Sequence, residues 1–220
     1  MQWEKLWPLL WQGAGETLYM TLWSSLFAYL LGLPLGILLT VTKRGGIMAR
    51  PSFNSVLGIL INFLRSIPFI IVLAMLFPVT RMVMGKAIGT SAVVFPLIVS
   101  AFPYVARMVE GSLEEVDHGI IEAALSMGST NRQIIFKVLL PEAVPSLMNG
   151  AAICVTTILG YTALASAAGG GGLGAIAIVQ GLNIRKFDVM YSASLFLVLL
   201  VQIITVSGTR LTRGLDHKRH

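Results

Sequence analysis

The stretch EAALSMGSTNRQIIFKVLLPEA, Glu122 to Ala143, is a long polar interruption in a chain that is otherwise strongly apolar. Apolar residues recur at helical spacing up to Leu125, and Gly128 then interrupts the pattern. Thr130, followed three residues later by Gln133, is a capping-box signature for the start of a new helix. The stretch therefore predicts two short amphipathic helices joined by a turn at Gly128.

The second of these helices places Ile134, Ile135, Val138 and Leu139 on one face, and Pro141 is predicted to end it. A segment with one apolar and one charged face is typical of a piece that packs under a helix bundle and offers its other side to a groove of another protein. An inert surface loop is the alternative, but such loops are usually shorter and carry neither caps nor apolar faces.

The remainder of the chain has the composition of a membrane protein. Of its 220 residues 55% are hydrophobic and 12% are charged, whereas soluble domains carry about 25% charged residues. A bilayer core about 30 Å thick needs about 20 apolar residues of helix to cross it. Five stretches meet this length: residues 17–41, 56–80, 87–106, a stretch that begins near 143, and 189–209.

We therefore predict an all-α membrane protein with about five transmembrane helices. Residues 1–220 form a single domain with a core at about 13–213, and residues 113–141 form a loop between the third and fourth spans. The N-terminal segment with Trp3, Trp7 and Trp11 is expected to lie at the membrane surface. Gly32 and Gly36 form a small-xxx-small pair, which favours close packing between helices of the chain.

Prolines and glycines predict where the helices are interrupted. Four prolines within the spans are expected to kink or break them: Pro34, Pro68, Pro96 and Pro103. Residues 167–174 (AAGGGGLG) should end the fourth span, and the apolar residues after Gly174 predict a short re-entrant or interfacial piece. The four glycines that form this turn are Gly169, Gly170, Gly171 and Gly172.

The distribution of basic residues predicts the orientation of the chain. The net charge of +6 comes from residues at the ends of apolar runs, which argues against a nucleic-acid-binding surface. With the N-terminus outside, five of the sixteen (Lys5, Arg81, Lys86, Arg185 and Lys186) lie outside and the other eleven lie inside. The rule predicts an outer N-terminus, a cytoplasmic C-terminus and a cytoplasmic 113–141 loop.

Several chemistries find no support in the sequence. GGGGLG lacks the Lys-Ser/Thr of a phosphate-binding loop, and the histidines have no metal-ligand spacing and no nucleophile beside them. The acidic residues fall at interfaces or in loops, which disfavours a proton-coupled carrier. We therefore expect neither an enzyme nor a chain that binds ATP, a cofactor or a metal by itself.

The loop resembles the cytoplasmic motif of the membrane subunits of bacterial ABC importers. That motif reads Glu-Ala-Ala, three residues, Gly, nine residues, Ile, one residue, Leu-Pro. The matching residues are Glu122, Ala123, Ala124, Gly128, Val138, Leu140 and Pro141, with Val138 as the one departure. The resemblance implies that the 113–141 loop docks onto a partner ATPase subunit, which binds ATP-Mg, and transmits its opening and closing.

A narrower resemblance covers most of the chain. FLRSIPFIIVL (63–73), YVARMVEGSLEEV (104–116), the opening stretch and GGGGLGAIAI (169–178) are similar to methionine-import permeases. This implies a type I ABC importer permease fold, a homodimer in the bacterial inner membrane, and methionine uptake with a periplasmic or lipid-anchored binding protein. The turn at residues 169–172 would then face that binding protein, or merely end a helix. Another amino acid or an osmoprotectant is the alternative substrate, and an ion-coupled carrier or channel the alternative mechanism.

Candidate residues for the translocation path are few. Arg65 is the one charge inside a predicted span; it either lies near the path, reaches the interface, or pairs with Glu110. Tyr161 and Thr162 offer hydroxyls in the fourth span and Leu164 an apolar gate, with plain helix packing as the alternative.

Overall fold

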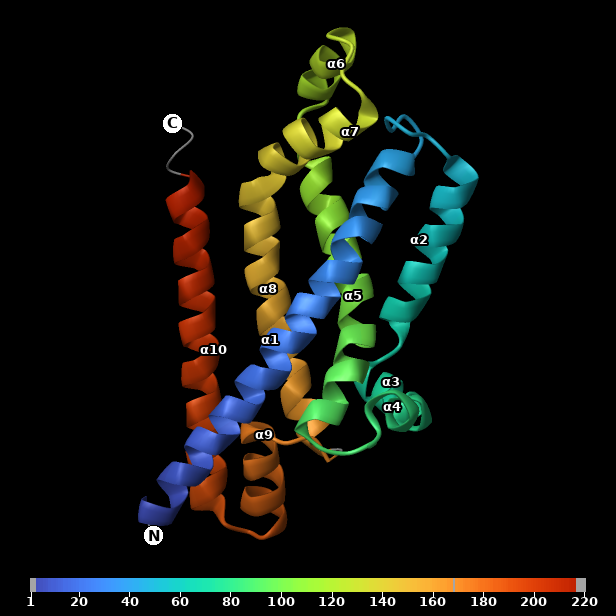
Figure 1. Ribbon diagram of the computed structural model, residues 1–220. Helices are drawn as coiled ribbons and strands as arrows, with labels where there is room; N and C mark the ends of the chain where they lie inside the picture. The colour runs from blue at the N-terminus through green and yellow to red at the C-terminus, as the bar shows by residue number, and fades with distance from the viewer. Residues whose placement is uncertain (1–2, 168, 217–220) are drawn as a thin grey trace.

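Five long helices form the body of the molecule in the computed structural model, which describes residues 3–167 and 169–216 (Figure 1). They are α1 (Trp3–Thr42), α2 (Pro51–Ser66), α5 (Thr90–Glu114), α8 (Leu140–Ala167) and α10 (Phe187–Asp216). The short elements are α3 (Phe69–Met75), α4 (Phe77–Met84), α6 (His118–Ser126), α7 (Asn131–Ile134), the π-helical turns η1 (Ile135–Leu139) and η2 (Ile176–Asn183), and α9 (Leu173–Ala175). No strand occurs within these residues, which confirms the all-α prediction.

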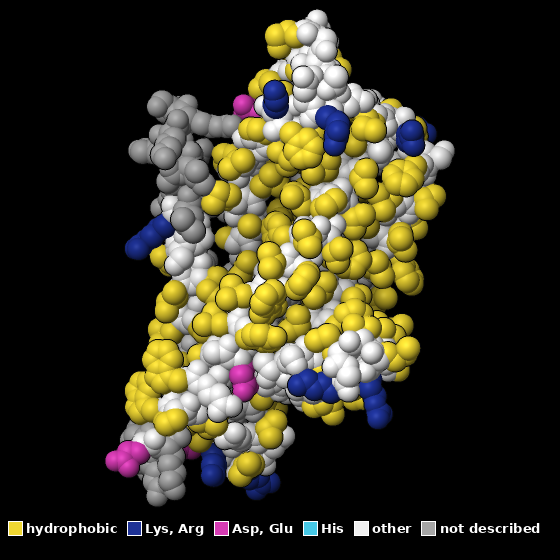
Figure 2. All heavy atoms as spheres, viewed as in Figure 1, with side chains coloured by type: hydrophobic (Ala, Val, Ile, Leu, Met, Phe, Trp, Pro, Cys, Tyr) yellow, Lys and Arg dark blue, Asp and Glu magenta, His cyan; other side chains and the backbone are white. Residues whose placement is uncertain are grey.

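The long helices have the length and apolarity of membrane spans. Four runs qualify alone: Leu6–Thr42, Thr90–Glu114, Asn131–Ser166 and Phe187–Gly208. The pair α2 and α3 supplies a fifth only if its 95° bend is counted as one broken span. Hydrophobic side chains cover the middle of the visible face, and charged side chains gather mostly toward its two ends (Figure 2).

Two helices extend beyond the predicted spans. The first helix begins at Trp3, so the segment predicted to lie at the membrane surface is helical and continuous with the first span. The third span was expected to end at residue 106, but α5 continues to Glu114 and includes Arg107 and Glu110. Both polar residues stay in the helix because the Arg107 guanidinium and the Glu110 carboxylate pair at 2.6 Å, which offsets the removal of their charges from water.

The second predicted span, residues 56–80, is divided at Pro68. Proline disfavours helical geometry in the residue before it, and Ile67 is extended, with φ −84° and ψ 121°. The chain turns there, so α3 and α4 lie across the end of the bundle opposite α6 (Figure 1). The other three prolines expected to interrupt spans lie inside continuous helices, Pro34 in α1 and Pro96 and Pro103 in α5.

The most extensive contact between described helices lies between α1 and α5. A Cβ atom added at Gly32 would lie 2.6 Å from Val105 Cβ, and one added at Gly36 would lie 2.6 Å from the Ala106 carbonyl oxygen. Two glycines four residues apart therefore let the two backbones meet, which confirms the packing predicted for this pair. Val105 and its neighbour Val109 are fully buried at this contact.

The candidate coupling site and the opposite end of the bundle

The candidate coupling loop, residues 113–141, begins with a short capped helix. The Asp117 carboxylate accepts a hydrogen bond from the Gly119 backbone N–H at 2.6 Å and so caps α6. At the other end, the Gly128 N–H donates to the Leu125 carbonyl at 2.9 Å, and the next N–H donates to the Ala124 carbonyl at 3.1 Å. This is a Schellman ending, which needs the left-handed backbone of Gly128 (φ +77°).

The second helix starts where the sequence predicts it. The Thr130 backbone N–H donates to Gln133 Oε1 at 2.8 Å, and the Gln133 N–H donates to Thr130 Oγ1 at 3.4 Å. These reciprocal bonds form the predicted capping box and fix the direction in which α7 leaves the turn. The chain reverses between α6 and α7 through a turn whose hydrogen bonds join residues only a few positions apart.

The prediction that Pro141 ends this helix is wrong. The helix continues from Asn131 through α7, η1 and α8 to Ser166 as one run. Within η1 the bonds are i→i+5, and the Leu140 N–H reaches back to the Ile135 carbonyl. The wider turn removes the carbonyl that a proline at position 141 would meet in a regular α-helix, so the chain passes through it without a break.

The loop has two distinct faces. Ala124, Ile134 and Leu139 are buried in a cluster with side chains of α1 and α5, such as Val41 and Leu113. The other face is exposed, and it carries Glu122, Ala123, Leu125, Met127, Arg132, Phe136 and Lys137. The seven motif residues divide between these faces: Glu122, Ala123, Gly128 and Pro141 are exposed, Ala124 is buried, and Val138 and Leu140 are half-buried against the bundle.

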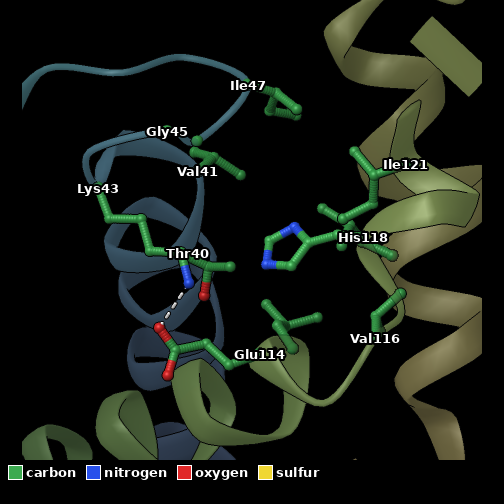
Figure 3. A pocket seen from close by; sticks show the side chains of 12 residues that line it. Thr40, Val41, Lys43, Gly45, Ile47, Glu114, Val116, His118 and Ile121 are labelled. Atoms are coloured by element: carbon green, nitrogen blue, oxygen red, sulfur yellow. Dashed lines mark hydrogen bonds and ion pairs between the residues drawn. The ribbon is translucent and has the colours of Figure 1, made fainter.

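A small cavity marks the joint between this loop and the bundle (Figure 3). Its volume is about 40 Å³, and it is lined by the end of α1, the turn after it, the end of α5 and the start of α6. The His118 ring, from the first residue of α6, points into it, and Lys43 Nζ and Glu114 Oε1 pair across its edge at 2.7 Å (Figure 3). The loop is thus tied to both α1 and α5.

At the other end of the bundle, the turn at residues 169–172 joins three helices. The Gly172 N–H donates to Glu16 Oε2 of α1 at 2.7 Å, and the Leu173 N–H donates to Thr17 Oγ1 at 3.0 Å. The Gly89 N–H at the start of α5 donates to the Gly169 carbonyl at 2.9 Å. The Glu16 carboxylate and the Thr17 hydroxyl thereby cap, from α1, the short helix Leu173–Asn183 that follows the turn.

The geometry explains why this turn is built from four glycines. Gly169 (φ +95°) and Gly172 (φ +92°) have left-handed backbones. A Cβ atom at Gly170 would lie 2.9 Å from the Ala165 carbonyl oxygen, and one at Gly171 would collide with Glu16 and Thr90. The turn is therefore a packed junction, in agreement with its reading as a helix terminator.

Replacing Gly171 with valine is expected to lower the melting temperature of the purified protein by about 5 °C. The cause is overpacking against the Glu16 carboxylate, which typically costs about 1–3 kcal/mol. Gly111→Val is the matched control, because a Cβ there meets nothing within 4 Å. Equal melting temperatures for the two variants would show that the junction is not tightly packed.

Two of the four candidate path residues, Arg65 and Tyr161, lie close enough to interact electrostatically, and the other two lie elsewhere on α8. Arg65 is exposed in the last turn of α2, where its positive charge suits the helix end. Of the three alternatives for Arg65, the pairing with Glu110 is not formed, because the Glu110 carboxylate pairs with Arg107. Tyr161 stacks on Phe69 of α3, with ring centroids 5.0 Å apart.

The remaining two candidates lie in different environments. Thr162 is fully buried, and its hydroxyl donates to the Leu159 carbonyl at 2.7 Å, so it takes part in packing. Leu164 is half exposed on α8.

Sequence reasoning missed a polar clamp between α2 and α5. Besides pairing with Glu110, the Arg107 guanidinium donates from Nη2 to the Gly58 carbonyl of α2 at 2.9 Å. Both side chains are mostly buried. The i,i+3 spacing of Arg107 and Glu110 was an available signal for an ion pair on one helix face. The expected span ended at residue 106, so both residues were placed just outside it.

Comparison with known proteins identifies related chains. Residues 32–220 match a family model described as the inner membrane component of binding-protein-dependent transport systems. The probable D-methionine transport system permease protein MetI of Pasteurella multocida is 42% identical over 214 residues, 97% of this chain and 99% of the relative. The methionine import system permease protein MetP of Bacillus subtilis is also 42% identical, over 95% of this chain and 94% of its own length.

Solved structures agree with these relatives. A structure described as an inward-facing conformation of the MetNI methionine ABC transporter contains a chain that is 44% identical, covering 98% of this chain and 99% of its own length, with a TM-score of 0.95. A chain from an amino acid ABC transporter is 22% identical with a TM-score of 0.74, which shows a shared fold.

Proposed function

Because this chain belongs to the family of inner membrane components of binding-protein-dependent transport systems, we propose that it is the membrane-spanning permease subunit of an importer for methionine. The likeness to methionine permeases over nearly the full length carries this proposal, with identities of 42% to the relatives from Pasteurella multocida and Bacillus subtilis. The near-identical fold in the MetNI transporter supports it. The protein is a multi-pass protein of the bacterial inner membrane with the type I ABC importer permease fold.

The permease does not hydrolyse ATP itself and works with an ATPase subunit and a substrate-binding protein. Two copies surround the translocation path, each docked on an ATPase subunit that binds and hydrolyses ATP-Mg. A substrate-binding protein delivers methionine on the outer side, where the N-terminus lies, and the C-terminus lies in the cytoplasm. ATP binding draws the two ATPase subunits together and the bundle opens outward; hydrolysis returns it to the inward-facing state.

The candidate coupling loop supplies the mechanical connection. Its exposed face, with Glu122 and Arg132, sits in a groove of the ATPase. Its buried face moves with α1 and α5, because Ala124 and Ile134 pack into the same cluster as those helices. The Lys43–Glu114 ion pair and the turn at Gly128 keep the loop in a fixed direction relative to the bundle. A displacement of the ATPase thus becomes a displacement of the helices.

Uptake by the reconstituted complex tests the proposed function. The chain is placed in proteoliposomes with its ATPase and binding protein, and uptake of labelled methionine is followed with and without ATP. We expect methionine uptake that requires ATP and both partners. ATP-dependent uptake of a different amino acid or of an osmoprotectant would overturn the substrate, and transport by the chain without any ATPase would overturn the mechanism.

Glu122→Lys is expected to reduce recovery of the ATPase with the purified permease by at least tenfold. Glu122 is exposed, so reversing its charge leaves the bundle intact but places a cation where the docked surface receives a carboxylate. Glu122→Gln, which keeps the shape of the side chain, should retain more of the partner. Co-purification from membranes measures both. If Glu122→Lys recovers as much ATPase as the wild type, Glu122 does not contact the ATPase.

A further inference from the structure

A groove of about 280 Å³ between α8 and α10 contains an unusual number of polar groups for a membrane span. Its walls are formed by Asn149, Ala152, Ile153, Thr156, Thr157 and Thr205. Asn149 lies nine residues beyond Leu140 at the start of α8, which at 1.5 Å per residue is about 13 Å along the helix. The groove thus begins about 13 Å along a helix that is long enough to cross a bilayer core about 30 Å thick.

Asn149 is the residue that calls for an explanation. Its side chain is exposed, and its amide makes no hydrogen bond to another residue in the described part of the chain. Polar groups are costly in lipid, and in membrane proteins they face protein or a water-filled cavity. The Asn149 amide therefore indicates that this side of α8 meets something polar.

The threonine hydroxyls beside it are oriented by the helix. Thr156 Oγ1 donates to the Ala152 carbonyl and Thr157 Oγ1 to the Ile153 carbonyl, each at 2.9 Å. Because the Thr157 proton is engaged in this way, the lone pairs of its oxygen remain to accept hydrogen bonds, while Thr156 Oγ1 also lies within hydrogen-bond distance of Thr205. Thr205 of α10 brings a third hydroxyl oxygen within 3.4 Å of Thr156 Oγ1. The groove combines hydroxyl acceptors with the two N–H donors and the carbonyl of the Asn149 amide.

We propose that this groove binds the ammonium and carboxylate groups of an amino acid during its passage through the membrane. The Thr157 oxygen and the Asn149 carbonyl accept from the ammonium, and the Asn149 NH₂ donates to the carboxylate. None of the described residues that line the groove is Lys, Arg, Asp or Glu, which matches a ligand without net charge. Ile153, half exposed beside these groups, offers an apolar surface to the side chain of the ligand. This proposal rests on the proposed function and names the surface that the substrate contacts.

Transport kinetics of two groove variants test it in the full complex. Asn149→Leu removes the amide and Thr157→Val removes one hydroxyl at constant volume. Loss of one or two hydrogen bonds predicts a KM for methionine uptake about tenfold higher in Asn149→Leu and a smaller rise in Thr157→Val. Ser192→Ala is the control, because Ser192 on α10 makes the same type of bond, to the Asp188 carbonyl, away from the groove. Unchanged KM in both groove variants would overturn the proposal.

Cysteine accessibility gives a second reading that does not depend on transport by a variant. The native Cys154 is fully buried, so the wild-type chain supplies a low background. Ile153→Cys should react with a water-soluble methanethiosulfonate reagent and be protected by methionine, because the reagent needs a thiolate in water. Leu30→Cys, at a position 64% exposed on the outer surface of α1, should not react. An unreactive Ile153→Cys would show that lipid or a second copy covers the groove.

The two kinds of failure can be told apart. If the wild-type complex takes up methionine but Ile153→Cys is reactive and unprotected, the groove proposal is wrong and the proposed function stands. If the wild-type complex takes up a different amino acid, that amino acid replaces methionine in the protection assay, and protection by it supports the groove while the methionine assignment falls.

Discussion

Gly128→Val is expected to reduce ATP-driven uptake by at least tenfold while the membrane bundle stays folded. Gly128 has φ +77°, a left-handed backbone that costs a β-branched residue more than 1 kcal/mol. A Cβ there meets nothing within 4 Å, so the penalty falls on the turn and not on the packing of the helices. The Schellman ending is lost, and α6 leaves the direction that docking requires. Uptake by the reconstituted complex and recovery of the ATPase measure the effect.

Gly128→Asn is the matched control for this prediction. Asparagine tolerates the left-handed region better than other residues with a Cβ, so this variant should retain much of the transport. Equal transport by the valine and asparagine variants would mean that the direction of α6 does not matter for coupling.

Gly36→Leu is expected to prevent accumulation of folded protein. A Cβ at Gly36 would lie 2.6 Å from the Ala106 carbonyl oxygen and 2.6 Å from Val109 Cβ, so α1 and α5 must separate to admit a leucine. Separation exposes a contact that buries Val105 and Val109 and should cost at least about 3 kcal/mol, a large part of the stability of a typical protein.

Size-exclusion chromatography in detergent and thermal unfolding measure this second effect. Gly15→Leu is the control on the same helix, since a Cβ at Gly15 has nothing within 4 Å. A monodisperse Gly36→Leu protein that melts with the wild type would contradict the helix contact.

Local signals predicted the candidate coupling loop well. The capping box of Thr130 and Gln133 and the turn at Gly128 depend only on residues within a few positions of one another, and both are confirmed. Gly32 and Gly36 gave the right contact for a similar reason, because two missing side chains on one helix face leave room that a neighbouring helix fills.

Features that depend on more distant contacts were predicted less well. Pro141 breaks a regular α-helix, but the sequence does not reveal that a π-helical turn precedes it. Pro68 divides a span and Pro96 does not, although both lie in apolar stretches. Arg107 and Glu110 were placed outside the span because their pairing and the Gly58 carbonyl, which make their burial acceptable, come from the folded arrangement of α2 and α5.

The proposed substrate groove could not be predicted from the sequence, because it too depends on contacts between distant segments. Tyr161 and Thr162 were selected because they carry hydroxyls in a span; the Thr162 hydroxyl bonds to the Leu159 carbonyl, and the Tyr161 ring stacks on Phe69. The groove formed by Asn149, Thr157 and Thr205 requires α8 and α10 to be placed side by side. Asn149 alone, an amide within an apolar stretch, was a signal that could have been used.

Cross-linking from the exposed face of the candidate coupling loop tests most directly whether the ATPase subunit docks on that face. Ala123→Cys lies on that face, and Lys86→Cys lies exposed at the opposite end of the bundle; the buried Cys154 contributes little background. With a short thiol-to-amine cross-linker in intact membranes, which joins the introduced cysteine to a lysine of the partner, we predict that Ala123→Cys forms a product with the ATPase subunit and that Lys86→Cys forms none. A product from Lys86→Cys and none from Ala123→Cys would contradict both the docking site and the orientation of the chain.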